Sequence, residues 1–134
     1  EPGVLSLVAE AGGRIVGHVV LTPCRAGGDG PKVALLGPLA VAPERQKQGI
    51  GSALVREGLA RMAGAGAARV LVLGDPAYYA RFGFAEETEI ATPVDIPDDW
   101  AAAWRSVRLS PAATVPGVRL AVPAPWRDPA LWGP

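Results

Sequence analysis

The sequence predicts one α/β domain, and three features support that prediction. Apolar runs at residues 33–41 and 70–73 have the length and composition of buried strands. Between them, apolar side chains recur at helical spacing from about Gln48 to Met62. A much shorter helix follows the second run, with Asp75 as its expected N-cap and Gly83 ending it. The 134 residues suffice for one core and contain no repeat or dividing linker, so we expect residues 1–134 to form a single domain.

Composition limits the partners and the location of the protein. Thirteen basic and thirteen acidic residues cancel, and no run of one sign occurs, which argues against nucleic acid or an anionic membrane as the main partner. One cysteine and one histidine argue against a disulfide framework or a metal centre. No apolar run approaches the roughly 18 residues of a membrane span, and no signal peptide is visible. We therefore expect a cytoplasmic protein, and the start without Met leads us to expect a longer natural chain.

The first strands contain two ambiguous features. Residues 4–10 and 14–21 are predicted to form a hairpin, followed by a glycine-rich loop at 23–31. His18 is expected to be a hydrogen-bonded sheet residue, with a substrate-facing role as the alternative. Gly37-Pro38 removes a side chain and an N–H from the strand at 33–41, so a bulge or a splayed edge is expected there. This fault marks either an edge strand or a gap where a ligand pairs with the backbone.

The start of the long helix has the features of an anion site. A polar loop at 43–47 leads into Gln46-Lys47-Gln48-Gly49-Ile50-Gly51, with the helix expected to begin near Gln48. Free backbone N–H groups and the helix dipole attract phosphate there, and glycines let it approach the backbone. Arg45 and Lys47 can add positive charge. The alternative is a glycine-rich helix start that binds nothing.

Two familiar nucleotide sites do not fit this loop. The third glycine of a dinucleotide-binding fingerprint is replaced by the bulky Leu54, and Gly49 follows Val41 by eight positions, too far for the tight turn required. No Gly-Lys-Ser/Thr triplet is present, which excludes a nucleotide-binding P-loop.

The C-terminal third gives weaker signals. A strand is predicted at 85–92, a turn at 97–99, a strand or short helix at 100–109 and a closing strand at 118–122. Residues 123–134 contain four prolines and two tryptophans and are expected to be irregular.

Three segments in order resemble the GCN5-related N-acetyltransferase (GNAT) superfamily, in particular its YhbS-like branch. They are Leu39-Ala40-Val41-Ala42-Pro43, Gln46 to Gly51, which fits Arg/Gln-x-x-Gly-x-Gly/Ala, and Tyr79-Ala80-Arg81-Phe82-Gly83-Phe84. The resemblance covers residues 4–91 well. It implies a mixed central sheet splayed between two strands with flanking helices, and a cofactor-binding core at 33–84. The family's N-terminal strand and two helices are not evident in this chain.

The resemblance also implies a donor site for acetyl-CoA. Backbone groups of Leu39, Ala40 and Val41 would pair with the pantetheine arm. The pyrophosphate would bind the amides of Gln46, Lys47, Gln48, Gly49, Ile50, Gly51 and Ser52. Asp75 stands where relatives often have an asparagine that contacts the cofactor, although an N-cap explains it equally well. Tyr79 matches the general acid that protonates the departing thiolate, while Tyr78 is expected to pack or to line the acceptor pocket.

The implied reaction is acetyl transfer to a primary amine by direct attack, without a metal. The acceptor would be a small molecule or a peptide, and a homodimer stays open. No base is evident, because apolar residues and Gly37-Pro38 occupy the strand that supplies one in some relatives. We expect the amine to arrive neutral or to lose its proton through water, with His18 as the outside candidate. The alternative is a non-catalytic acyl-CoA-binding or sensing module: Tyr79 favours an enzyme, and the lack of a base favours the alternative.

Overall fold

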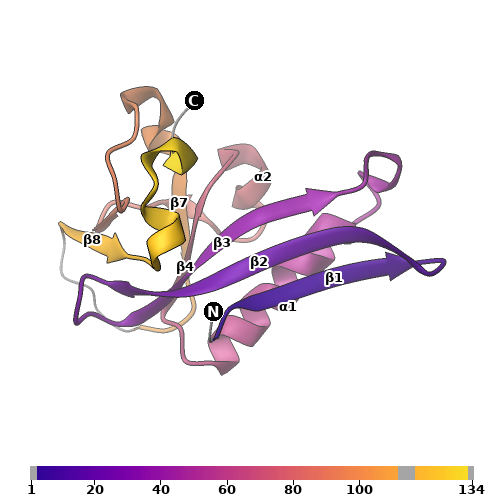
Figure 1. Cartoon of the computed structure of the whole chain (residues 1–134), viewed down its shortest axis with the longest axis horizontal. Helices are drawn as coiled ribbons and strands as arrows, with labels where there is room; N and C mark the ends of the chain where they lie inside the picture. Colours follow the sequence, from indigo (N-terminus) through magenta and orange to yellow (C-terminus); the bar gives the residue numbers. More distant parts are fainter. Residues whose placement is uncertain (1–2, 112–116, 133–134) are drawn as a thin grey trace.

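The fold is a curled, mixed sheet with one long helix on one face and the C-terminal segments on the other (Figure 1). The computed structural model describes residues 3–111 and 117–132. The first half contains β1 (Leu5–Ala11), β2 (Arg14–Ala26), β3 (Lys32–Val41), η1 (Pro43–Arg45), α1 (Ile50–Gly64), β4 (Arg69–Leu73) and α2 (Pro76–Ala80). The second half contains β5 (Ala85–Glu86), β6 (Ile90–Ala91), η2 (Asp98–Ala103), β7 (Trp104–Arg108), β8 (Val118–Ala121), η3 (Ala124–Arg127) and η4 (Pro129–Trp132).

The centre of the sheet is a parallel pair that separates. The strand order is β5-β7-β4-β3-β2-β8-β6, with β1 paired to β2. Strands β3 and β4 are in register only at Ala34–Val70 and Leu35–Leu71. Beyond these residues β3 continues to Val41 beside β2 alone, and Figure 1 shows the two strands diverging. The predicted splayed sheet is confirmed.

The predicted fault in β3 is a β-bulge. Val19 pairs with Leu39 and Leu21 with Leu36, so a single residue of β2 faces Gly37-Pro38. The Gly37-Pro38 peptide bond is cis, and Gly37 has a φ of 149°, a conformation that side chains rarely adopt. The bulge begins two residues after Leu35, the last residue of β3 that pairs with β4. It therefore falls at the point where the sheet opens.

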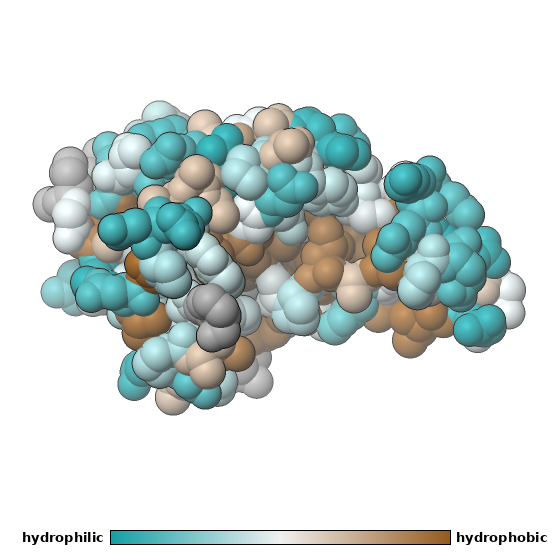
Figure 2. All heavy atoms as spheres, turned by 90° about the horizontal axis from the view of Figure 1, so that it is seen from above, coloured by the Kyte–Doolittle hydropathy of each residue, from teal (hydrophilic) through white to brown (hydrophobic). Residues whose placement is uncertain are grey.

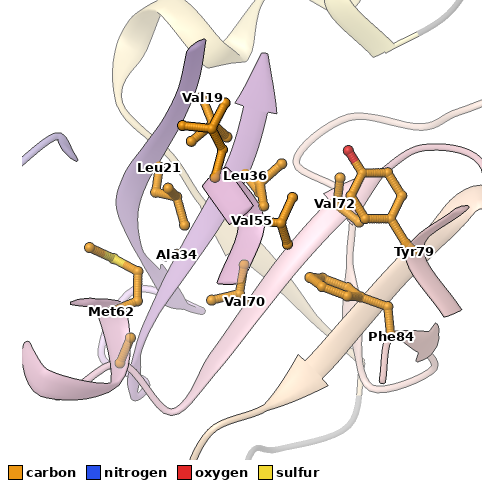
Figure 3. Packing of buried hydrophobic residues seen from close by; sticks show 12 residues of the cluster. Val19, Leu21, Ala34, Leu36, Val55, Met62, Val70, Val72, Tyr79 and Phe84 are labelled. Atoms are coloured by element: carbon orange, nitrogen blue, oxygen red, sulfur yellow. The ribbon is translucent and has the colours of Figure 1, made fainter. Parts of the chain in front are cut away.

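Successive side chains of the central strands point into two separate hydrophobic cores, because side chains alternate across a sheet. Ala34, Leu36, Val70 and Val72 face α1 and pack with Val55, Tyr79 and Phe84 (Figure 3). Val33, Leu35 and Leu71 face the opposite side, where Trp104, Leu120 and Trp132 cover them. Val33, Val55 and Val70 are fully buried, and each such side chain contributes about 1.5–3 kcal/mol of transfer free energy.

One end of β4 is anchored by a buried ionic network. The guanidinium of Arg69 donates to Oε1 of Glu87 at 2.7 Å and to Oε1 of Glu89 at 2.8 Å. The Ser106 hydroxyl donates to the same Glu87 oxygen, while the amides of Glu89 and Ile90 donate to the other. Glu87 is thus bound on both oxygens. This network fixes the turn between β5 and β6 against β4 and β7.

Several predicted element boundaries are wrong, for physical reasons. Strand β2 continues to Ala26, whereas a loop was expected from Pro23. Pro23 pairs with Ala34 of β3, but the other edge of β2 has no partner at this position. The pairing with β1 ends at Leu21 and that with β8 starts at Arg25, so no N–H is needed on that edge. Helix α1 begins at Ile50, two residues later than expected. The strand predicted at 85–92 is two short strands around the Glu87 turn, and 100–109 contains both a 3-10 turn and a strand.

The strand predicted at 118–122 is confirmed as β8, which pairs with β2 and β6. The irregular tail needs correction. The tail forms the turns η3 and η4, which return over the sheet and bury Trp132. Residues 1–2, 112–116 and 133–134 lie outside the described residues. The expectation of one domain over 1–134 stays a prediction.

Candidate active site

The loop before α1 borders a cavity of about 390 Å³, which we call the loop cavity. Its lining combines the end of β3, the loop and α1 start, and α2: Leu39, Val41, Arg45, Gln46, Lys47, Gly49, Gly51, Ser52, Tyr78 and Arg81. Most of the predicted donor-site residues are therefore together. Ala40, Gln48, Ile50 and Asp75 are not among the lining residues.

The first turn of α1 presents backbone N–H groups that the helix itself does not use. Its N-cap, Gly49, has a φ of 85° and supplies no side-chain cap. The first bond into the helix is from the amide of Ala53 to the Gly49 carbonyl, at 3.0 Å. The amides of Ile50, Gly51 and Ser52 precede that bond, and no acidic residue lies in the first turn. This end of the helix is thus suited to an anion.

Side chains add positive charge around the loop cavity. Arg45 and Lys47 line it, as predicted, and Arg81 joins them from the C-cap of α2. The Arg81 guanidinium lies 4.5 Å from the ring centroid of Tyr78, a cation–π contact. Sequence reasoning missed Arg81, although its i,i+3 spacing from Tyr78 was the available signal. A chain with no net charge therefore has a locally basic cavity.

Polar side chains of the loop hold its shape. Nε2 of Gln46 donates to the Val41 carbonyl at 3.2 Å, and Nε2 of Gln48 donates to the Glu44 carbonyl at 3.4 Å. Lys47 has a φ of 63°, an uncommon value for a residue with a side chain. The Asp75 carboxylate is the N-cap of α2 and accepts from the Ala77 amide at 3.0 Å. It is occupied as a cap, outside the loop cavity.

The two tyrosines of α2 have different surroundings. Tyr78 packs edge-on against Tyr79 and Phe82, and its hydroxyl lies at the loop cavity, where a Cβ added to Gly51 would be 2.7 Å away. The expected packing of Tyr78 is confirmed, and the cavity that it lines is the one that contains most of the predicted donor-site residues.

Tyr79 is 7% exposed and packs against the edge of Phe84 at 5.4 Å between ring centroids. Figure 3 shows its hydroxyl on the side of the ring away from Phe84, beside Val72. Burial, with a smaller effect from Tyr78, raises the pKa of Tyr79 to about 12. The phenol therefore keeps its proton at physiological pH, as a general acid must.

A second cavity, of about 420 Å³, lies where β3 and β4 separate, and we call it the splay cavity. It is lined by Leu35, Leu36, Leu73, Gly74, Asp99, Trp100, Ala103, Trp126, Leu131 and Trp132. Leu36 also packs in the core cluster of Tyr79, and a Cβ added to Gly74 would lie 2.5 Å from Cε2 of Tyr79. Tyr79 itself lines neither cavity, but it packs behind Gly74 and Leu36 of the splay cavity and beside Tyr78 of the loop cavity. Seen from above, Figure 2 shows apolar side chains on the floor of a hollow across the molecule.

The remaining candidates lie elsewhere. Nε2 of His18 is 2.8 Å from the Ser6 hydroxyl oxygen, and His18 lines neither cavity. Within residues 3–111 and 117–132, no group of three or more His, Cys, Asp or Glu side chains is placed to hold a metal ion. In the same part of the chain, no helix is long and apolar enough to cross a membrane.

Solved structures with this architecture define the class of protein. One is a GNAT family acetyltransferase from Brucella melitensis in complex with acetyl-CoA, at 38% identity and a TM-score of 0.70, covering 90% of this chain and 66% of that one. Another is YhbS from Escherichia coli in complex with CoA, at 30% identity and a TM-score of 0.77, covering 89% and 67%. The fold is therefore the GNAT fold, and the class is acyltransferase.

The sequence comparisons agree with the structural ones. Residues 1–84 match the model of the acetyltransferase (GNAT) family. The uncharacterised N-acetyltransferase YjhQ of E. coli K12 is 36% identical over 126 residues, which are 89% of this chain and 70% of YjhQ. YhbS of the same strain is 38% identical over 103 residues, which are 75% of this chain and 59% of YhbS. The chain belongs to the GNAT family of acetyltransferases, and it spans between 59% and 70% of the length of these curated relatives.

Proposed function

We propose that the protein transfers an acetyl group from acetyl-CoA to a primary amine, with Tyr79 as general acid. The observation that carries this proposal is that Tyr79 contacts a residue of each cavity, Tyr78 of the loop cavity and Gly74 of the splay cavity. The first cavity has free amides and three basic side chains, which suit a pyrophosphate, and the second is open at the splayed strands. The structures similar to this chain are complexes with acetyl-CoA and CoA, which supports acetyl-CoA as the donor.

The donor would bind along β3 and the start of α1. The edge of β3 that carries Leu39, Ala40 and Val41 has no partner in β4, because the pairing between β3 and β4 ends at Leu35 and Leu71. The amides of the pantetheine arm can pair with that edge, as an added strand would. The pyrophosphate then meets the amides from Gln46 to Ser52, near Arg45, Lys47 and Arg81. Asp75 would act by capping α2 and so holding Tyr78 and Tyr79 in place.

In the reaction, the nitrogen of a neutral amine attacks the thioester carbonyl carbon. The C–N bond forms, the C–S bond breaks, and the amine nitrogen releases one proton to water. The departing thiolate takes a proton from the Tyr79 hydroxyl, which solvent later replaces, so the products are an acetamide and the CoA thiol. Donor and acceptor meet in one site, and this proximity supplies much of the rate. His18 is bonded to Ser6 and takes no part in this scheme.

Replacing Gly51 with valine is expected to weaken acetyl-CoA binding at least about tenfold. A Cβ at this position would lie 2.7 Å from the Tyr78 hydroxyl oxygen and 3.6 Å from Cγ2 of Val41, so the branched side chain fills the loop cavity. Isothermal titration calorimetry measures the change. Gly64→Val in the same helix is the matched control, because a Cβ at Gly64 meets nothing within 4 Å. Equal acetyl-CoA affinity in both variants would remove the loop cavity as the donor site.

A further inference from the structure

We propose that the splay cavity selects acceptor amines that carry an aromatic or other flat apolar group and that have no negative charge. This inference rests on the proposed function and adds the substrate class of the same site. It concerns residues that neither the family signature nor the linear sequence singled out. These are chiefly Trp100, Trp126 and Trp132, together with Asp99.

The lining of the cavity is apolar and aromatic. Three of its ten lining residues are tryptophans and four are leucines. A volume of about 420 Å³ lies within the range of small-ligand pockets. A polyhydroxylated or highly charged acceptor would leave its polar groups against indole and leucine side chains, where they lose hydrogen bonds to water. An acceptor with a flat apolar body fits this wall without that cost.

The aromatic wall is held in place by the packing of the tail. Trp132 is 2% exposed, and its indole N–H donates to the Trp126 carbonyl at 2.9 Å. Its ring makes edge-to-face contacts with Trp104 at 5.6 Å and with Trp126 at 6.0 Å between centroids. Trp126 is only half-buried, so one part of this array stays open to a ligand. A guest ring can extend the edge-to-face arrangement, a geometry that aromatic pairs favour.

The wall lies at the reacting end of the sheet. A Cβ added to Gly37 would be 3.9 Å from Cη2 of Trp126, so the indole lies over the bulge where β3 leaves β4. Gly74, which also lines the cavity, touches the ring of Tyr79. An amine bound against Trp126 would therefore share the cavity with Gly74, whose backbone separates it from the Tyr79 ring.

Charge supplies the second part of the selectivity. Asp99 is the one charged residue among the ten that line the splay cavity, and no basic residue lines it. The carboxylate attracts an ammonium group, and the faces of the tryptophans add cation–π attraction. A carboxylate or phosphate on the acceptor would meet only repulsion. Aromatic amines that arrive as ammonium ions are favoured on both counts, and each must first lose one proton to water before its neutral nitrogen attacks.

The test measures CoA thiol release with three amines at saturating acetyl-CoA. These are 2-phenylethylamine, ethanolamine and 4-(2-aminoethyl)benzoate. We expect kcat/KM for 2-phenylethylamine to exceed that of each other amine at least about tenfold, the scale at which pockets discriminate by apolar contacts. Trp126→Ala should reduce this preference to within about threefold, through KM for 2-phenylethylamine. Ile15→Ala, an exposed site outside both cavities, is the control and should keep the preference.

A second variant, Asp99→Lys, changes the charge of an exposed residue and so tests the selectivity without removing a packed side chain. Asp99→Lys should raise kcat/KM for 4-(2-aminoethyl)benzoate and lower it for 2-phenylethylamine, inverting their order. A wild-type protein that acetylates ethanolamine as well as 2-phenylethylamine overturns the inference and leaves the proposed function standing. Where no amine is acetylated, binding of 2-phenylethylamine to the CoA complex is followed by tryptophan fluorescence. No quenching of the wild type at 10 mM, or equal quenching of the wild type and Trp126→Ala, also overturns it. Failure of the proposed function would instead appear as no binding of acetyl-CoA.

Discussion

Replacing Tyr79 with phenylalanine is expected to lower kcat by at least about 10²-fold, the lower end of what a general acid contributes. The substitution removes one oxygen from a ring that otherwise keeps its contacts with Phe84, Tyr78 and Gly74. Stability and acetyl-CoA affinity should therefore change little. Steady-state assay of CoA thiol release and a parallel calorimetric titration separate the two effects.

Tyr78→Phe is the matched comparison, since it removes the neighbouring hydroxyl on the same helix. Because that hydroxyl lies at the loop cavity, we expect its loss to change the KM for acetyl-CoA more than kcat. Normal turnover in Tyr79→Phe together with a large loss of kcat in Tyr78→Phe would assign the acid role to Tyr78.

The acid role has a defined pH dependence. The pKa of Tyr79 is raised to about 12, so its phenol stays protonated, and able to donate, until pH rises toward that value. An unfolded tyrosine ionises near pH 10. Protonated Tyr79 thus favours the folded state fully below about pH 10, and this contribution is lost as pH rises through 12. We expect no decrease in kcat assignable to this phenol between pH 7 and 10.

Glu87→Ala is expected to lower the free energy of unfolding by about 3 kcal/mol, the lower end of the usual cost of removing one partner of a buried ion pair, because Arg69 keeps its bond to Glu89. Arg69 and Glu87 have side chains that are 3% and 1% exposed, and the loss also frees two amides and the Ser106 hydroxyl. Such a change is a large share of the stability of a typical domain. Urea unfolding followed by tryptophan fluorescence measures it.

The control is Glu57→Ala, which breaks an ion pair with Arg61 on the surface of α1, where both side chains are more than half exposed. Pairs of this kind are worth about 0.3–0.5 kcal/mol. If Glu87→Ala costs no more than Glu57→Ala, the network does not hold the turn between β5 and β6.

Glu87 also predicts acid sensitivity. Burial alone would raise the pKa of its carboxyl, but bonds from Ser106, the Ile90 amide and Arg69 together outweigh burial and hold the pKa below its usual range. A glutamate in the unfolded chain titrates near pH 4.3. The stabilisation is therefore present above about pH 4.3 and is lost as pH falls through the lower folded value. Wild-type stability should fall in this range, and Glu87→Ala should show less of that fall.

The loop cavity was predictable because its information is local. The glycines, the basic residues and the Gly37-Pro38 fault lie within a short stretch of chain, and each has a backbone consequence that sequence alone indicates. The bulge, the N-cap at Asp75 and the grouping of Lys47, Gly49 and Gly51 follow from such rules, whereas the splayed sheet was expected from the family resemblance.

The splay cavity and the buried ion pair depend on contacts between segments that are distant in the sequence. Trp126 lies over Gly37, 89 positions away in the sequence (126 − 37), and nothing in the composition of the tail indicates where it folds back. The Arg69–Glu87 pair likewise joins residues whose charges look like ordinary surface charges in the sequence. Periodicity identifies elements but not which of them meet, so the splay cavity emerged only from the fold.

The most direct test of a donor site at the loop cavity is a calorimetric titration of the wild-type protein with acetyl-CoA. We predict one site per chain, with a Kd between about 1 μM and 1 mM, the range usual for enzyme substrates. Lys47→Glu should weaken binding by placing negative charge beside the free amides of α1. If folded protein gives no heat of binding up to about 1 mM acetyl-CoA, the loop cavity is not a donor site.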